Sequence, residues 1–471
     1  MGNPSWKIRL LLPRNGNCPG RWSQLSARTR CAFLRDWAAI IVLDPNMRRI
    51  ACAVSLLPAI LAAETLDFDQ AQKYALFHSP AIQAAYSTIG QARGRLLQSG
   101  LWPNPEIDLS YRADVFFGGE GQDKAMASLM QRLPWSGRLA RAQNVSRVEV
   151  AMALAEVRDA ERKLVLDVQR AFIQARAAAE KAASLKKLIG SVDSLIALNE
   201  AQRQAGQGSA MAVNLAKVER EGLRQQLLSL EADEGVALAT LQGLLGMKEP
   251  PGLKNSMAEI ISRLRQGTTG KKLYRPDLVR ASLEADAVAA EIALARAETW
   301  EDITVGVEYE FMRTLDGPDL MNDNFLGARV ILPLPVWNRN QGAIAEKTAG
   351  RERAKRALEA TKLDIEAGIA AARVRAAKTA SVASLILKDS LPLLDETRGV
   401  LESAIQTGQA DTTEAITLTN QEITQRLFYV DSLMNQAQAL SELEAALGSN
   451  RHLHRDIFTN TIHDKKPPAK H

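Results

Sequence analysis

The sequence predicts a mainly helical protein with a small β part, in which one structural unit occurs twice. Short motifs of the first half return in the second half in the same order, offset by 196 to 202 residues. Hydrophobic residues make up 46% of the chain but aromatic residues only 5%, a composition that favours long helices with closely packed backbones. Early in each half, the helical rhythm gives way to the two-residue alternation of strands.

Four landmarks carry the duplication, and their nearly constant spacing indicates a structural repeat. In the first half they are Ser79-Pro80-Ala81-Ile82, Leu133-Pro134-Trp135, Ala205-Gly206-Gln207 and Leu244-Leu245-Gly246. Their counterparts in the second half are, in the same order, Arg275-Pro276-Asp277-Leu278, Leu334-Pro335-Val336-Trp337, Thr407-Gly408-Gln409 and Ala446-Leu447-Gly448. We therefore expect a first repeat at residues 64–246, a linker at 247–272, a second repeat at 273–448 and a flexible tail at 449–471.

The basic excess of the chain lies at its front. Residues 1–63 hold 9 of the 59 Lys and Arg residues and 2 of the 54 acidic residues, which leaves 50 basic against 52 acidic residues in 64–471. A basic surface for nucleic acid is therefore not expected after residue 63, and nucleic acid is not an expected partner.

Residues 47–63 are predicted to be a secretory signal peptide, and residues 1–46 an extension that precedes the native start. The positive pair Arg48-Arg49 comes before an apolar stretch at 50–62, and small residues at the end of that stretch offer a cleavage site. An apolar core helix is the alternative interpretation of this stretch.

Long helical hairpins fill most of each repeat. An unbroken helical rhythm from 138 to 204 predicts a rod of about 100 Å at 1.5 Å per residue. A return helix is expected from 210 to 245, after a turn at Gly206. In the second repeat, a long helix is expected at 342–406, a tip at 407–411 and a return helix from there to 447. The helices that open the two repeats are expected at 69–101 and 276–300.

Each repeat also contains a pair of short amphipathic strands. At 106–113 and 303–311, apolar side chains alternate with polar ones over about nine residues, the length of a tilted membrane-crossing strand. Weaker partner strands are expected at 125–133 and 326–332, and a half-buried sheet of a soluble domain is the alternative for any single strand. The polar faces are predicted to line a wet lumen with four charged residues, Asp108, Arg112, Glu308 and Glu310.

Four tryptophans follow residue 63, and each lies where a helix and a strand are expected to meet. Indole rings prefer the half-wet boundary of a membrane, so we interpret the four as an aromatic belt, with ordinary packing as the alternative. They are Trp102, Trp135, Trp300 and Trp337.

Four strands cannot close a barrel, and an open sheet edge is not tolerated in lipid. We therefore expect copies of the chain to share one barrel, with eight strands from two copies or twelve from three. The long helices would continue this barrel as a helical wall, so the assembly is expected to be a conduit.

Repeat, strand placement and helical tips together resemble the TolC family of outer membrane efflux channels, over about residues 64–448. The resemblance implies a homotrimer with a twelve-stranded transmembrane β-barrel and a periplasmic α-helical barrel, placed in the lipid of the cell outer membrane. It also implies two partners, a periplasmic adaptor protein and an inner-membrane pump that supplies the energy. Among the branches of this family, the overall pattern is most similar to those that serve heavy-metal exporters.

The resemblance assigns roles to the tips of the helical hairpins. Members of this family carry a glycine there and often an acid six residues later, which contributes to a negative ring at the periplasmic entrance. Glu414 matches this acid, whereas the first half has Ala212. Glu414 is therefore a gate candidate, and a solvated residue in a first helical turn is the alternative. The residues implied to dock the partners are Gly206, Gln207, Gly208, Gly408 and Gln409.

Motifs of enzymes are not found in this sequence, which lacks a phosphate loop, an HExxH pair and a nucleophile elbow. No cofactor and no metal site are expected, because the region expected to be ordered has no quartet of metal ligands. Thiolate metal sites are excluded there, since all three cysteines, Cys18, Cys31 and Cys52, precede the predicted cleavage site. The expected function is passive export of heavy-metal cations or drugs, with selectivity left to the pump. The alternatives are a coiled-coil scaffold without a pore and the outer membrane component of a type I protein secretion system.

Overall fold

The computed structural model places the described residues in one unit, Ala63–His471. They are residues 65–113, 123–206, 209–268, 275–316, 319–406 and 412–448. The predicted extension, signal peptide and tail, and the tip residues Gln207, Gly208, Gly408 and Gln409, lie outside this set. In the part that is described, none of the helices combines the length and the apolar character needed to cross a membrane.

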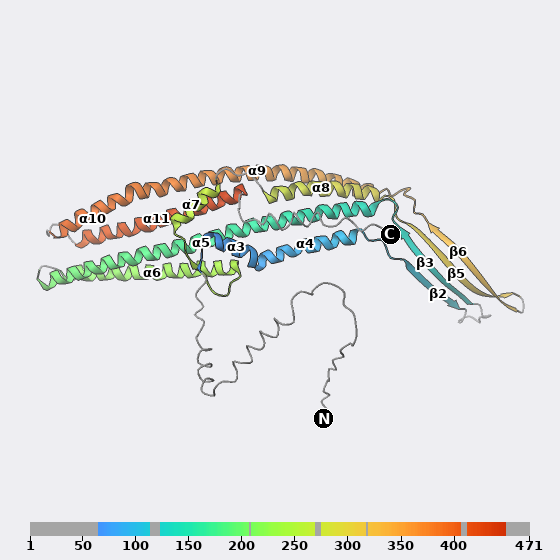
Figure 1. Ribbon diagram of the computed structural model, residues 1–471, viewed down its shortest axis with the longest axis horizontal. Coiled ribbons are helices and arrows are strands. Elements are labelled where there is room, and N and C mark those ends of the chain that lie inside the picture. The colour runs from blue at the N-terminus through green and yellow to red at the C-terminus, as the bar shows by residue number, and fades with distance from the viewer. Residues whose placement is uncertain are drawn as a thin grey trace, which may run out of the picture. The chain divides into compact units, whose positions relative to one another are not determined.

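Long helices dominate the unit, as the sequence predicts (Figure 1). Helix α5 covers Arg138–Gln204 and its partner α6 covers Ala210–Leu245, the two ranges expected from the periodicity. Gly206 at the turn has a φ of 77°, which a side chain would strain, and the Ser209 hydroxyl accepts a hydrogen bond from the Met211 N–H at the start of α6. The second hairpin is formed by α9 (Gln341–Leu385), a π-helical turn η1 (Ile386–Ser390), α10 (Leu391–Gln406) and α11 (Thr412–Leu447).

The prediction of a single helix at 69–101 is wrong, because the chain forms two helices there, α3 (Phe68–His78) and α4 (Pro80–Ser99). Ser79 between them is extended, and Pro80 has no N–H to continue the hydrogen-bond ladder of α3. In the second repeat, α8 runs over Pro276–Ala297 and also starts at a proline.

The linker at 247–272 contains a helix that the sequence interpretation did not include. Helix α7 (Met257–Thr268) buries an apolar face with the helical spacing of Met257, Ile260 and Leu264. Strand β4 (Gly252–Leu253) precedes it and pairs in parallel with β1 (Thr65–Leu66). The neighbouring prolines and glycines obscured this short helix in the sequence.

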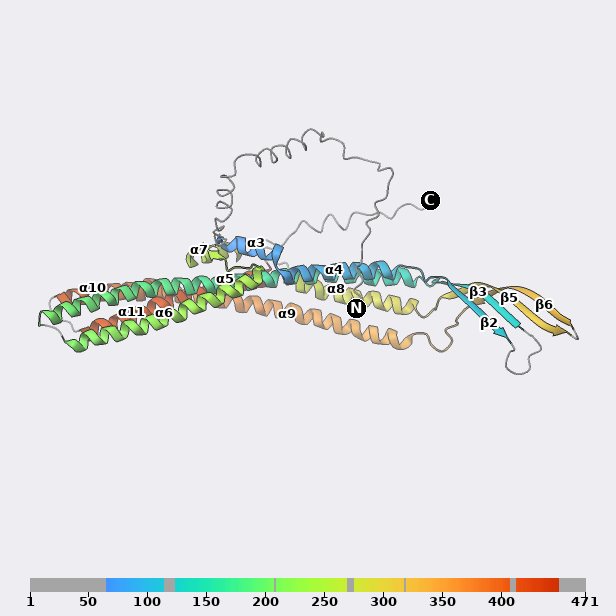
Figure 2. The ribbon, with the colours of Figure 1, turned by 90° about the horizontal axis from the view of Figure 1, so that it is seen from below.

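The long helices form a single layer (Figures 1 and 2). In the half that carries the hairpin tips, the order of contacts is α6, α5, α11, α10, and in the half next to the strands it is α4, α5, α8, α9. Helix α6 ends where α4 begins. Gly246, with a φ of 71°, lies so close that a Cβ there would be 3.0 Å from Pro80 Cδ. The end of α11 likewise lies at the start of α8, where Arg275 donates to the Ala446 carbonyl, which matches the duplication seen in the sequence.

Beyond the helices, four strands form an antiparallel sheet in the order β2, β3, β5, β6. Strand β2 covers Glu106–Ala113, as predicted, and β3 covers Asp123–Leu133. Strands β5 (Ile303–Asp316) and β6 (Asp319–Ile331) are longer than expected. The two strands remain paired up to Asp316 and Asp319. The sequence did not predict these additional residues, because apolar and polar side chains do not alternate there.

The main core lies where α3 and α7 pack on α5 and α11. Phe172 of α5 is fully buried there and makes an edge-to-face contact with Phe68 of α3, at 5.5 Å between ring centroids. Leu241, Met257 and Leu264 complete the centre of this cluster. This packing fixes the position of α3 and α7 along the long helices α5 and α11.

Candidate functional site

The register of the sheet separates a polar face from an apolar face. Asp108 is opposite Ser128, which is opposite Glu308, while the next residues along each strand, Ile107, Leu129 and Val307, form the neighbouring row. Side chains alternate across a sheet, so these two rows lie on opposite faces. The four residues predicted to share the polar face do so: Asp108, Arg112, Glu308 and Glu310.

Ion pairs connect the strands across the polar face. Arg329 lies 2.8 Å from Glu308, Lys124 lies 2.7 Å from Glu310, and Arg132 lies 2.6 Å from Glu106. Opposite charges in diagonal or facing positions favour this strand register. The face is therefore charged, with both signs interspersed.

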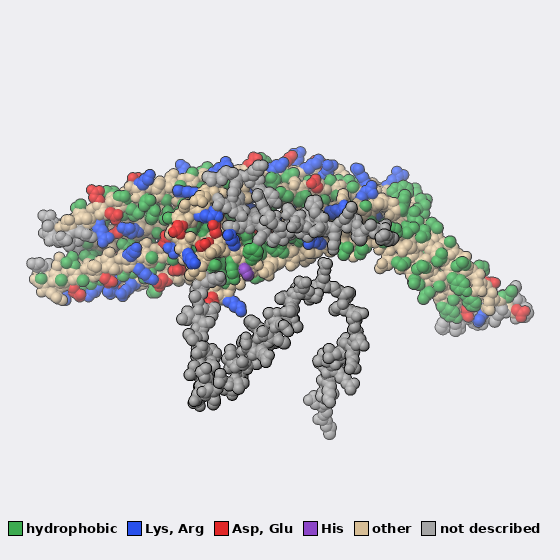
Figure 3. All heavy atoms as spheres, in the orientation of Figure 1, with side chains coloured by type: hydrophobic (Ala, Val, Ile, Leu, Met, Phe, Trp, Pro, Cys, Tyr) green, Lys and Arg blue, Asp and Glu red, His purple; other side chains and the backbone are tan. Residues whose placement is uncertain are grey.

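The opposite face is covered with exposed apolar side chains (Figure 3). All four strands contribute large exposed side chains to this face. Examples are Ile107 (72% exposed), Leu109 (74%), Val307 (54%), Leu326 (84%) and Val330 (69%). A contiguous apolar surface of this kind marks a face that contacts lipid or another protein.

All four tryptophans lie at the junctions between helices and strands, where the sequence places them. All four side chains are exposed. Trp135 and Trp300 pack edge to face, with 5.3 Å between their ring centroids. The Trp135 indole N–H donates to the Glu301 carbonyl at 3.0 Å. The structure thus brings two of the four into direct contact.

The layer of helices and the sheet are open at the same two edges. One edge consists of α6, α4 and β2, and the other consists of α10, α9 and β6. Strands β2 and β6 each have only one hydrogen-bonded neighbour within the described residues. Because the two edges differ, a head-to-tail contact, in which one edge of a copy meets the other edge of the next copy, covers both of them.

The hairpin tips lie at the end of the unit opposite the sheet (Figures 1 and 2). Gly206 closes the α5 side of one tip, and Glu414 is exposed in the first turn of α11 at the other. The two predicted roles, partner docking and gating, therefore refer to the same end of the molecule.

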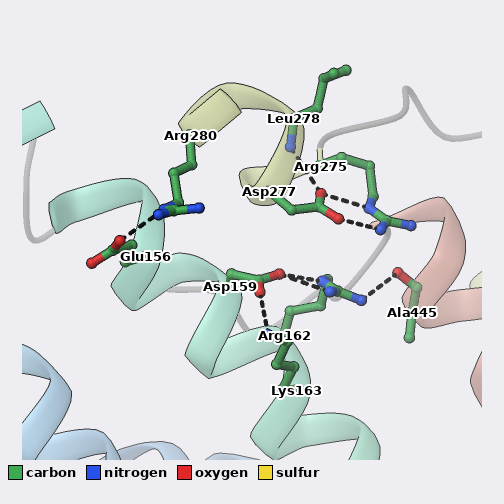
Figure 4. A network of polar contacts seen from close by, with 9 residues as sticks. All are labelled: Glu156, Asp159, Arg162, Lys163, Arg275, Asp277, Leu278, Arg280 and Ala445. Atoms are coloured by element: carbon green, nitrogen blue, oxygen red, sulfur yellow. Dashed lines mark hydrogen bonds and ion pairs between the residues drawn. The ribbon is translucent and has the colours of Figure 1, made fainter. Parts of the chain in front are cut away.

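A polar junction that sequence reasoning missed joins the two repeats (Figure 4). The Arg275 guanidinium donates to the Ala446 carbonyl at 2.8 Å, and Arg162 of α5 reaches the Ala445 carbonyl at 3.4 Å. These carbonyls lie in the last turn of α11, where the Ala445 carbonyl also accepts from the Gly448 N–H at 3.2 Å. Two cations at a helix C-terminus also suit its dipole. The only signal in the sequence was the arginine before the repeated proline.

Asp277 completes this junction by pairing with the Arg275 guanidinium. Burial alone would raise the pKa of Asp277, but hydrogen bonds and charge from Arg275, the Leu278 N–H and the charge of Arg162 together hold the pKa below its usual range. The ion pair thus stabilises the fold above the pKa of the unfolded chain, about 3.9. The contribution is lost as the pH falls through the lower folded value.

Replacing Arg275 with methionine is expected to lower the free energy of unfolding by about 1–3 kcal/mol at neutral pH, because a helix carbonyl and a half-buried carboxylate lose their partner. Unfolding in urea, followed by circular dichroism, measures the change. The difference from the parent should narrow as the pH falls below about 4, the pKa of Asp in the unfolded chain, and through the lower folded pKa of Asp277. The control Arg280→Met breaks an exposed pair with Glu156 and should cost no more than about 1 kcal/mol. Equal effects of both variants would contradict the assigned role.

Comparison with known proteins gives a consistent picture. Residues 72–247 match the model of a family described as outer membrane efflux protein. The pyoverdine export outer membrane protein OpmQ of Pseudomonas putida is 25% identical over 330 residues, which cover 64% of this chain and 68% of that protein. The cobalt-zinc-cadmium resistance protein CzcC of Cupriavidus metallidurans is 21% identical over 438 residues, which cover 89% of this chain and all of that protein.

Solved structures share the fold. CusC superposes with a TM-score of 0.67 at 17% sequence identity, over 82% of this chain and 93% of that chain. The CmeC outer membrane channel of Campylobacter jejuni gives a TM-score of 0.64 at 13% identity, over 81% of this chain and 85% of that chain. The mainly helical fold with a small sheet, predicted from the sequence, is confirmed.

Proposed function

The chain belongs to the TolC-like family of outer membrane efflux proteins, and we propose that three copies form a passive export channel through the outer membrane and the periplasm. The observation that carries the proposal is the coincidence of two open edges with an exposed apolar sheet face. Head-to-tail closure of three copies would pair every strand edge in a twelve-stranded barrel and place the apolar face in lipid.

In this arrangement one face of the sheet contacts lipid and the other faces the lumen. The polar face, with Asp108 and Glu308 near its centre, lines the lumen, since charged side chains on a lipid-facing surface are costly. The four tryptophans form a belt at the membrane boundary next to the helices. The long helices extend from that boundary into the periplasm. Cell outer membrane localisation agrees with a signal peptide at 47–63.

The hairpin tips are proposed to receive the partners of a tripartite system, a periplasmic adaptor and an inner-membrane pump. Both tips lie at the end farthest from the sheet, where a channel anchored in the outer membrane would meet such partners. Energy would come from the pump, and so would the choice of solute. The relatives agree with that view, because their names refer to different cargoes, pyoverdine for OpmQ and cobalt, zinc and cadmium for CzcC.

Cell fractionation tests this proposal. The mature chain should be found in the outer membrane fraction, should need detergent for release, and should migrate as a heat-modifiable oligomer. Release by osmotic shock as a water-soluble single chain would contradict the channel and favour a periplasmic scaffold.

Glu414 is proposed to contribute a ring of carboxylates at the periplasmic entrance, one from each copy. Glu414→Gln should therefore weaken cation selectivity, seen as a reversal potential closer to zero in planar bilayers under a salt gradient. The matched control Glu249→Gln neutralises an exposed carboxylate after α6, away from both tips, and should leave the reversal potential unchanged. An unchanged potential for Glu414→Gln would remove this residue as a gate candidate.

A further inference from the structure

The apolar face of the sheet is not flat, because two successive side chains on that face of β3 are small. Ala125 and Ala127 each lie between a larger residue of β2 and a larger residue of β5. The larger residues are Leu109 and Tyr111 on β2 and Tyr309 and Phe311 on β5. Paired residues of neighbouring strands stand side by side on one face, so the two alanines form the floor of a trough with bulky walls.

A groove of about 350 Å³ occupies this trough. Its walls include Leu109, Tyr111 and Tyr309, and its lining is mostly apolar. The lining residues belong to β2, β3 and β5 of one copy. The groove therefore lies within the sheet of a single chain, and closure of the proposed barrel would leave it open on the lipid-facing side.

The two ends of the groove differ. Toward the helices, the next residue on the same face of β3 is Leu129, which is large and exposed. Toward the far end of the strands, the next residue is Asp123, which is opposite Arg313 of β5. Charged side chains gather at this far end, whereas apolar ones cover the surface nearer the helices (Figure 3). The groove is thus blocked at one end by a leucine and leads at the other end to two opposite charges.

The strand register gives the depth of the groove in a membrane. Strand β5 begins at Ile303, just after Trp300, and Arg313 lies ten residues further on, about 33 Å along the strand. At a strand tilt of about 40° this is about 25 Å of height, which equals the apolar band of a transmembrane barrel. Leu129 is opposite Val307, about 10 Å above Ile303 on the same basis. The groove therefore extends from the outer boundary of the band to near its middle.

Arg313 is the only basic residue on the apolar face of the described strands. Its Nε donates to the Asn322 side-chain oxygen at 3.3 Å. Its Nη1 lies 3.7 Å from the Asp123 carboxylate, which is too far for a hydrogen bond. In the described part of the sheet, the two terminal nitrogens of Arg313 therefore keep donors for a further acceptor. A guanidinium matches the oxygens of a phosphate group, which it binds through two parallel hydrogen bonds.

The walls of the groove present hydrocarbon and not free polar atoms. The Tyr309 hydroxyl donates to the Asn324 side-chain oxygen on β6 at 2.5 Å, so it has its partner within the sheet. A hydroxyl in lipid needs such a partner, because hydrocarbon tails accept no hydrogen bond. The Tyr309 ring is left to line the groove, together with Leu109 and Tyr111. An apolar chain with an acidic head matches this combination of apolar walls and one cation.

We infer that the groove seats one acyl chain of a phosphorylated glycolipid of the outer leaflet, with a phosphate of its head group against Arg313. The inference rests on the proposed channel, because it requires the apolar face to lie in the outer membrane. Depth and charge both favour this occupant. Between heights of about 10 and 25 Å the groove spans about 15 Å, half of a hydrocarbon core of about 30 Å, which is the share that one leaflet supplies. Each copy of the chain would hold one such site.

Native mass spectrometry of the detergent-extracted channel tests the site, with purified lipid A titrated into the delipidated protein. Ala127→Leu fills the groove with an apolar side chain and should raise the Kd for lipid A about tenfold, while the oligomer stays intact. Arg313→Gln should also raise this Kd about tenfold, because a charge-assisted contact with phosphate is lost. Dephosphorylated lipid A should bind the parent and Arg313→Gln equally, since neither contact then includes a phosphate.

Two control variants separate the groove from general properties of the sheet. Ala328→Leu makes the same change as Ala127→Leu on the apolar face, opposite Val307 and outside the groove. Arg112→Gln removes the same charge as Arg313→Gln, but from the polar face and one row away. Both controls should bind lipid A as tightly as the parent.

The outcomes separate this inference from the function on which it rests. A three-chain complex in which the parent, Ala127→Leu and Arg313→Gln bind lipid A with the same Kd would overturn the groove and leave the channel standing. A parent protein that stays a single water-soluble chain would overturn both. Should Ala127→Leu fail to assemble, Arg313→Gln still decides, because the same increase in Kd for lipid A and its dephosphorylated form would contradict a phosphate at Arg313.

Discussion

Replacing Val305 and Val307 with arginine is expected to abolish assembly in the outer membrane. Both residues alternate with Glu308 on β5, and register with Gln131 and Leu129 places them on the apolar face. An arginine on the lipid-facing surface of a barrel costs about 2–4 kcal/mol at the membrane midplane, and two of them in each of three copies exceed what a marginally stable assembly tolerates.

The amount of detergent-extracted oligomer in the outer membrane fraction, measured by immunoblot, checks this prediction. The matched control is Glu308→Gln on the same strand. It changes a polar-face residue paired with Arg329 and should leave assembly intact while altering the single-channel conductance. Equal tolerance at both positions would show that the two faces of the sheet do not differ in their surroundings.

Replacing Phe172 with alanine is expected to cost about 3–5 kcal/mol, because it leaves a large cavity in the main core. Phe172 is fully buried in the centre of α5 and contacts Phe68. The cavity would loosen α3 and α7 from the rods, since both helices pack on this cluster.

Thermal unfolding in detergent, followed by circular dichroism, measures the loss for Phe172→Ala. The control Leu198→Ala removes a side chain that is 42% exposed on the same helix and should cost less than about 1 kcal/mol. A Phe172→Ala protein as stable as the control would mean that the packing of α3 and α7 on the long helices does not depend on this core.

The sequence predicted the long elements well, and local chemistry explains why. Helical periodicity together with the stop at Gly206 predicted the range of α5, Arg138–Gln204. Strand β2 was recognised from alternation. Other features depend on tertiary contacts. The α7 helix is short and flanked by prolines and glycines, and its stability comes from burial of Met257 and Leu264, which no local pattern reveals.

For the candidate site, the sequence predicted which residues share a face but not which residues meet. The polar row of the sheet and the tryptophan junctions follow from periodicity and position, and the structure shows both. Arg162 of the first repeat donates to the Ala445 carbonyl at the end of α11 in the second repeat, and the π turn has no signature in its sequence, Ile386–Ser390. Such features arise from packing between distant segments and are seen only when the fold is known.

Native mass spectrometry of the complex extracted from outer membranes in detergent tests the central claim most directly. A channel built by edge-to-edge closure of four-stranded sheets should give a mass of three mature chains, with no larger open series. A single-chain mass from a protein that had remained in the membrane fraction would contradict the shared barrel, because the edges of β2 and β6 would then have no partner chain.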